Sequence, residues 1–88
     1  MRLPVRGFDF FVRSLTGLDM VELNAHPDRD GARGTLEIAR RAAVDGDGKP
    51  RWPTMADVEA APWPEIKAAS EAALVASGLL DAEAQAGN

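Results

Sequence analysis

The spacing of apolar residues divides the chain into an extended N-terminal segment and four helical segments. Near the start, Phe8, Phe10 and Val12 alternate with Asp9 and Arg13, although Phe11 breaks the pattern. A period of two is typical of a strand with one buried face. We therefore predict an extended segment or short strand across Asp9–Leu15, preceded by another at Leu3–Arg6, with the following glycine at the bend.

A first helix is predicted from its capping residues. Thr16 suits the N-cap, and Asp19 occupies the capping-box position three residues later. Pro27 ends the helix after about Ala25, because proline disfavours helical geometry in the residue before it. Leu18 and Val21 are predicted to face the core. Met20 is a further candidate for the same inward face.

The second helix is predicted from about Ala32 to Val44, with Leu36, Ala39 and Ala43 along one face. This face is narrow and consists mostly of small side chains, which permits close approach to a neighbouring helix. The Gly- and Pro-containing stretch Asp45–Pro50 is then predicted to form a turn.

Thr54 is the expected N-cap of a third helix, with Asp57 as its capping-box partner. Met55 and Val58 are predicted to point inward. The helix is expected to end near Ala60, since Pro62 disfavours helical geometry in the residue before it.

The fourth helix is predicted to begin at Pro64, where the missing N–H costs nothing. Its inward stripe contains Ile66, Ala69, Ala73 and Ala76. Gly78 is the expected left-handed residue at the C-terminal cap, with Leu79 available for the accompanying hydrophobic contact.

These elements predict a mainly α fold, a small four-helix domain with a short extended or β segment at residues 3–15. The chain has 88 residues, which suits a single domain over 1–80. Residues 81–88 are polar and Ala-rich, and we expect a frayed or disordered tail there. Sixteen residues are alanine and 24 are larger apolar residues, enough for a thin core.

Charge and cysteine content narrow the function classes. The net charge is −4, and acidic residues interleave with the basic ones, whereas nucleic-acid binders carry a basic stripe. The chain has no cysteine, so it has no disulfide framework and no thiolate metal site. No apolar run approaches the roughly 20 residues of a membrane span. We expect no nucleic-acid partner, no membrane partner and a cytoplasmic location.

The spacing of the candidate catalytic and metal-binding residues does not match what such sites require. If Gly48 took the sixth position of a calcium loop, Ala43 and Thr54 would occupy two ligand positions that need oxygen-bearing acidic side chains. His26 is the single histidine and has no cysteine or carboxylate cluster beside it. No nucleophile elbow or glycine-rich phosphate loop is present. We expect a protein that is not an enzyme and that has no cofactor and no metal.

Trp52 and Trp63 each lie beside a proline, and two interpretations apply to both. They are large anchors for a core short of big side chains, or they line a groove for a partner. For Trp63 the core is favoured, because the helix that begins at Pro64 fixes it against the preceding turn. For Trp52 both interpretations stay open.

The order of four short motifs resembles tail assembly chaperones of long-tailed bacteriophages, prophages and gene transfer agents. Val12-Arg13-Ser14-Leu15-Thr16 is similar to their V-R-x-L-T opening, and residues 45–50 are similar to their D-x-D-G-x-P turn. Residues 54–58 resemble the helix opening that follows. Residues 72–79 resemble their closing A-A-x-x-x-x-N-G-L, with Ser77 where asparagine is usual.

The resemblance implies a non-enzymatic, mostly helical protein that coats the tape measure protein and keeps it soluble during tail assembly. It implies a location in the cytoplasm of the bacterial host and absence from the mature particle. Contacts with the tail tube protein and with a second copy stay open. The residues we expect to contribute to the partner surface are Trp52, Met55, Val58, Trp63, Ile66 and Leu74. The alternatives are a structural tail or head–tail component kept in the particle and a small helical DNA-binding regulator.

Overall fold

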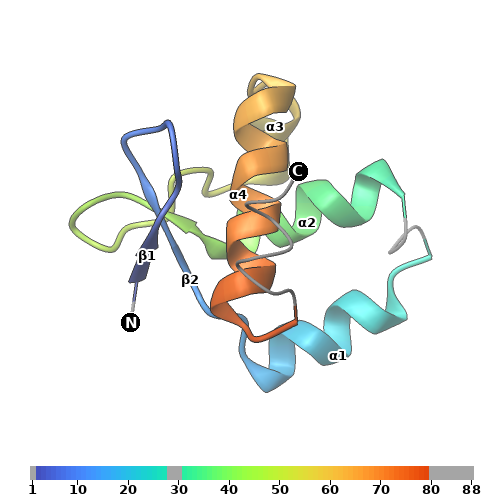
Figure 1. The fold of residues 1–88 in the computed structure, drawn as a ribbon. Helices are drawn as coiled ribbons and strands as arrows, with labels where there is room; N and C mark the ends of the chain where they lie inside the picture. Colours follow the sequence, from blue (N-terminus) through green and yellow to red (C-terminus); the bar gives the residue numbers. More distant parts are fainter. Residues whose placement is uncertain (1, 28–30, 80–88) are drawn as a thin grey trace.

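A computed structural model describes residues 2–27 and 31–79 of the chain. Within these ranges, the chain forms four helices and a small sheet of three strands, which lies to one side of the helices (Figure 1). The fold is therefore mixed, with helices and an antiparallel sheet, rather than purely helical. In chain order the elements are β1 (Arg2–Pro4), β2 (Phe11–Arg13), α1 (Gly17–Ala25), α2 (Ala32–Ala42), β3 (Ala43–Val44), α3 (Met55–Glu59) and α4 (Trp63–Ala76).

The N-terminal segment forms the β1–β2 hairpin, as its alternating pattern predicts, with strands of three residues each. Leu3 pairs with Val12 in antiparallel register. The turn between the strands is closed by the Phe8 N–H, which donates to the Val5 carbonyl at 3.1 Å. Gly7 has a φ of +87°, so the bend falls where an L side chain would be strained.

The third strand is a correction to the predicted second helix. This helix ends at Ala42, and the next two residues, expected to be helical, form β3 beside β2. Phe11 of β2 pairs with Val44, and this pairing satisfies the backbone groups that the helix would otherwise use. Strand order is β1-β2-β3, with all pairs antiparallel.

The Gly- and Pro-containing stretch forms the expected turn and returns the chain along β3. The Asp45 N–H donates to the Lys49 carbonyl at 2.8 Å, and the Gly48 N–H donates to the Asp45 carbonyl at 2.9 Å. Gly48 has a φ of +86°, which matches a three-residue hairpin loop with a left-handed residue at its end. Pro50 then bridges to Val44 on the outer side of β3.

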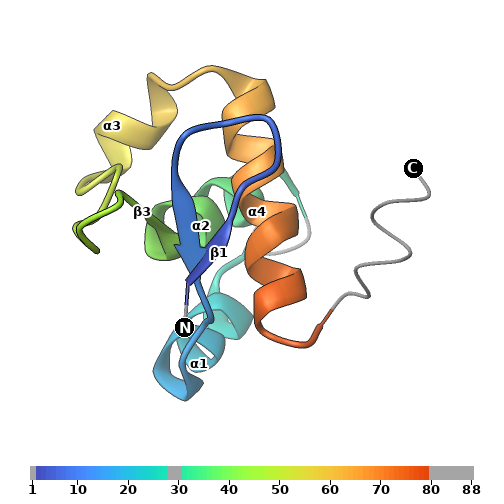
Figure 2. The ribbon, with the colours of Figure 1, turned by 60° about the vertical axis from the view of Figure 1, so that its left-hand side comes forward.

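Small residues bring α2 and α4 close together. Ala39 and Ala42 of α2 are buried, as are Ala69 and Ala73 of α4, and all four belong to one core cluster. Figure 1 shows α4 crossing in front of α2, and Figure 2 shows the sheet beside this crossing with α1 at its lower end. Alanine side chains permit this close approach, as the narrow predicted faces suggested.

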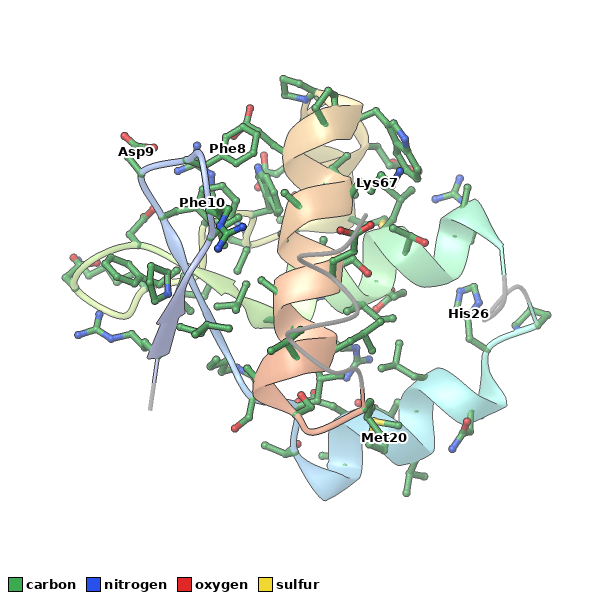
Figure 3. All side chains as sticks on the ribbon, viewed as in Figure 1. Phe8, Asp9, Phe10, Met20, His26 and Lys67 are labelled. Carbon is green, nitrogen blue, oxygen red and sulfur yellow. The ribbon has the colours of Figure 1, made fainter. Side chains whose placement is uncertain are left out.

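The larger core side chains come from the sheet, the loop before α3 and the two C-terminal helices. Val5, Phe10 and Val12 are buried on the face of the hairpin that covers the helices. Val58 and Ile66 reach the same cluster from α3 and α4. In Figure 3, Asp9 lies at the outer tip of the hairpin and Phe10 lies on its α4 side.

The predicted N-caps of α1 and α3 are confirmed, and so is the predicted C-terminal cap of α4. Thr16 and Thr54 each accept the backbone N–H of the aspartate three residues later. α4 begins at Trp63, one residue before the predicted start. Gly78 has a φ of +75°, and the Leu79 N–H donates to the Leu74 carbonyl at 2.8 Å, which is the Schellman pattern. The predicted tail at 81–88 lies outside the described residues.

Candidate partner-binding surface

The six residues predicted to form a partner surface do not lie on one exposed face. Trp52, Val58 and Ile66 are buried in the core cluster, and Met55 and Leu74 are half-buried. Trp63 is 48% exposed. The structure thus places three of the six side chains inside the molecule, where a partner cannot contact them while the domain stays folded.

Trp52 is a core anchor, which resolves the two interpretations of this residue. Its ring is 7% exposed and meets the Phe10 ring edge-on, with 5.7 Å between centroids. The Arg51 guanidinium lies 4.3 Å from the centroid of the Phe10 ring, and its Nη2 donates to the Glu65 carboxylate at 2.9 Å. These contacts join the loop before α3 to the hairpin and to α4.

Trp63 is a correction to the core placement that its neighbouring prolines favoured. It is the first residue of α4 and directly follows the N-cap residue Pro62. Lys67 lies one helical turn later and projects from the side of α4 opposite Phe8 and Phe10 (Figure 3). Trp63 therefore presents a half-exposed indole at the N-terminus of α4.

The largest departure from the sequence analysis concerns the faces of α1. The buried residues of this helix are Asp19 and Leu23, which are four positions apart and share one face. Leu18 is 68% exposed and Val21 is 66% exposed, although both were predicted to face the core. With the exposed Ala25 they form an apolar stripe on the opposite side, which we call the α1 outer face.

A buried carboxylate explains why α1 has this orientation. Asp19 Oδ2 accepts the Thr16 N–H at 2.8 Å and Arg13 Nη1 at 2.9 Å, and Oδ1 accepts Arg41 Nη1 at 3.0 Å. A buried carboxylate is costly unless it is paired and hydrogen-bonded. The two arginines come from β2 and α2, so they fix the Asp19 side of α1 inward and leave Leu18 and Val21 outside.

The ion pairs continue along α2 and couple three elements. Arg41 also donates to Glu22 Oε1 at 2.7 Å and to Glu37 Oε2 at 3.1 Å, and Arg40 donates to the same Glu37 oxygen at 2.9 Å. Arg41 thus serves three carboxylates at once, a use for which its planar fork of donors is suited.

The pKa values of these groups shift in the directions that the ion pairs require. Burial acts to raise the pKa of the Asp19 carboxyl, but hydrogen bonds from Arg13, Thr16 and Arg41 outweigh it and hold this pKa well below its usual range. Burial likewise acts to raise the pKa of Glu37, and hydrogen bonds from Arg40 and Arg41 lower it overall. The network is charged at neutral pH.

A cavity of about 440 Å³ opens beside the ion pairs. Its lining combines ion-paired side chains of β2, α1 and α2 with apolar residues from β3 and the loop that follows it. The lining residues are Arg13, Asp19, Glu22, Arg40, Arg41, Val44, Gly48, Pro50, Trp52 and Pro53. The charged side chains are already paired within the chain, so we assign no ligand to this cavity.

The described residues offer neither a group of metal ligands nor a membrane-spanning helix. Within residues 2–27 and 31–79, no three histidine, cysteine or acidic side chains gather in a way that would hold a metal ion. None of the helices in these ranges combines the length and the apolar character that crossing a membrane requires.

Comparison of the chain with protein-family models, with curated proteins and with solved structures finds no match in any of the three. A functional inference therefore rests on the residues and on this geometry. Among the described residues, the exposed large apolar side chains are Phe8, Leu18, Val21, Trp63 and Leu79.

Sequence reasoning missed the α1 outer face because it assigned apolar residues to the core. One local signal pointed to the other solution. Asp19 and Leu23 are spaced four apart, as residues of one face are. The partners that make a buried Asp19 tolerable, Arg13 and Arg41, lie on other elements, and no pattern within α1 indicates them.

Proposed function

We propose that this chain is a tail assembly chaperone of a long-tailed bacteriophage, prophage or gene transfer agent, which binds the tape measure protein and keeps it soluble before the tail tube assembles. The observation that carries the proposal is the order and spacing of the four motifs within residues 12–79. Each motif alone is short, and the weight comes from their arrangement along one small chain.

The local geometry supports this proposal, because each motif occupies a point that shapes the fold. The first leads from β2 into the N-cap of α1, and the second forms the hairpin loop after β3. The third contains the capping box of α3, and the fourth ends α4 at Gly78.

The surface also suits a chaperone of this kind. Leu18, Val21 and Trp63 are large apolar side chains held outward on regular helices. Rigid, exposed apolar residues on helices are the type of contact that holds an amphipathic partner helix. Met55 and Leu74, each half-buried, remain available at their outer edges.

The proposal is tested by co-expressing the chain with the tape measure protein encoded by the same genome. Affinity purification and gel filtration then follow. We expect the two to co-elute, and we expect more of the tape measure protein in the soluble fraction than when it is expressed alone. A tape measure protein that aggregates while this chain elutes free would overturn the proposal.

Mass spectrometry of purified particles separates this function from that of a retained tail component. A chaperone is expected to be absent from the finished tail, so peptides of this chain should not be recovered there. Recovery in stoichiometric amounts would instead identify a structural subunit of the tail or the head–tail junction.

A further inference from the structure

We infer that α1 is an arm that opens separately from the rest of the domain. In the open state, residues 16–25 leave the surface of the domain, while the sheet, α2, α3 and α4 stay folded. Ion pairs to β2 and α2, rather than apolar packing, hold the arm closed. This inference concerns the conformational behaviour of the chain and does not depend on the proposed function.

The weak apolar attachment of α1 is the first argument. The helices α2, α3 and α4 all supply residues to the core cluster, among them Ala39, Val58 and Ile66. Within the described part of the chain, no residue of α1 belongs to this cluster or is one of the partly buried apolar residues packed against it. Leu23 is buried but lies outside the cluster, and six of the nine residues of α1 are exposed, so opening of α1 leaves the core cluster intact.

The ion pairs are the second argument. Asp19 pairs with Arg13 of β2 at 2.9 Å and with Arg41 of α2 at 3.0 Å, and Glu22 pairs with the same Arg41 at 2.7 Å. The Coulomb attraction in such pairs is largely offset by the cost of removing the charges from water, so the intact network contributes only a small net stability. When α1 opens, water hydrates its carboxylates again. The free energy of opening should therefore be smaller than that of unfolding the core.

The chain is anchored immediately before α1. The Leu15 N–H donates to Ser77 Oγ at 2.8 Å, and the Leu15 side chain packs against the core cluster. The arm therefore begins at Thr16, the N-cap of α1. A helix of nine residues is too short to be stable by itself in water. Once its ion pairs separate, α1 should lose its helical hydrogen bonds, and its amide hydrogens then report the opening.

Opening changes the surface beside the ion pairs. Asp19 and Glu22 contribute to the lining of the cavity there, together with Arg13 and Arg41. With α1 open, both guanidinium groups lose their α1 carboxylates, and of its three carboxylate partners Arg41 retains Glu37. The arm thus covers the two arginines in the closed state and uncovers them in the open state.

Native-state hydrogen exchange on the full chain tests the inference. The rates are measured for each amide by NMR at neutral pH, in the regime where they report opening equilibria, and those of α1 are compared with those of residues 69–73 in α4. After correction for intrinsic rates, we expect the α1 amides to exchange about tenfold or more faster. They should also respond less to low concentrations of urea, because opening of α1 exposes less surface. Equal protection and equal urea dependence in the two helices would overturn the inference.

A matched pair of variants on α2 tests what holds the arm. Arg41→Gln removes the pairs to Asp19 and Glu22, whereas Arg33→Gln removes a pair to Glu59 of α3. Neither change alters the sequence of α1, so its helix propensity is constant. We expect Arg41→Gln to accelerate α1 exchange by about tenfold or more, and Arg33→Gln to change it by less than about threefold. Equal α1 exchange in the two variants would show that the ion pairs do not hold the arm, which contradicts the inference.

A core variant tests whether the arm opens separately. Val58 is fully buried in the core cluster, so Val58→Ala should accelerate α4 exchange by about tenfold or more, because these amides exchange when the core unfolds. Exchange in α1 should change by less than about threefold, since its opening leaves Val58 packed. If Val58→Ala does not fold, Ile66→Val makes a smaller change in the same cluster. Equal acceleration of both helices would mean that α1 opens only with the whole domain, and the inference would then be wrong.

Discussion

Asp19 of α1 and Arg41 of α2 form a salt bridge of 3.0 Å between residues 22 positions apart in the chain. The same carboxylate accepts a hydrogen bond from Arg13 of β2 at 2.9 Å, so one acidic side chain joins a strand and two helices. This junction sets the orientation of α1, and the orientation of α1 determines which of its residues are exposed.

Neutralising Asp19 should destabilise the domain and change its response to acid. Asp19→Asn leaves Arg13 and Arg41 without their shared anion, and we expect a loss of about 1–3 kcal/mol in the free energy of unfolding. Urea unfolding at neutral pH measures this loss. The matched control is Glu59→Gln, which breaks the more exposed pair with Arg33 and should cost less than about 1 kcal/mol.

The acid dependence follows from the lowered pKa of Asp19. A carboxyl whose folded pKa lies below its unfolded value stabilises the fold above the unfolded value, about 4, and this contribution is lost as pH falls toward the folded pKa. The difference in unfolding free energy between the wild type and Asp19→Asn should therefore be smaller at about pH 3 than at pH 6. An equal difference at both pH values would show that the Asp19 ion pairs do not contribute.

The two tryptophans should report different environments. Trp52 is packed against Phe10, whereas Trp63 is half-exposed. In single-tryptophan variants made with Trp52→Phe or Trp63→Phe, iodide should quench Trp63 strongly and Trp52 weakly. Trp52→Ala should cost about 3–5 kcal/mol of stability, and Trp63→Ala should stay within about 1 kcal/mol. Equal quenching of both indoles would contradict this placement.

Gly78 should tolerate added volume but not a β-branched side chain. A Cβ at this position meets nothing within 4 Å, so the cost of substitution comes from its φ of +75°. We expect Gly78→Val to lower the free energy of unfolding by on the order of 1 kcal/mol or more, and Gly78→Asn to cost clearly less. Thermal melts of both variants make the comparison, and equal melting temperatures would mean that the left-handed cap is not required.

The close contact between α2 and α4 should resist larger side chains. Ala69 is fully buried in the core cluster that also contains Ala39 of α2. Ala69→Leu should destabilise the domain by about 1–3 kcal/mol through overpacking, although leucine is a good helix former. Ala56→Leu, on the exposed side of α3, is the control and should be nearly neutral. Equal stability of the two variants would indicate that the helices are free to separate.

Local sequence was sufficient to predict the N-caps of α1 and α3, the C-terminal cap of α4 and the turns. The caps at Thr16 and Thr54 depend on an aspartate three residues away, and the end of α4 depends on Gly78 and the residues next to it. The bend at Gly7 and the loop at Gly48 likewise use a glycine with positive φ. These features involve only a few consecutive residues, so the pattern of the chain contains all the information they need.

Tertiary structure decided the placement of the apolar side chains that local periodicity left open or misplaced. Val44 left the predicted helix because β2 offered it a strand partner, and Trp52 entered the core because Phe10 lies opposite it. Leu18 and Val21 became exposed because arginines from two other elements made the burial of Asp19 favourable. Each of these outcomes depends on the energy of contacts between residues far apart in the chain, which periodicity within one segment does not contain.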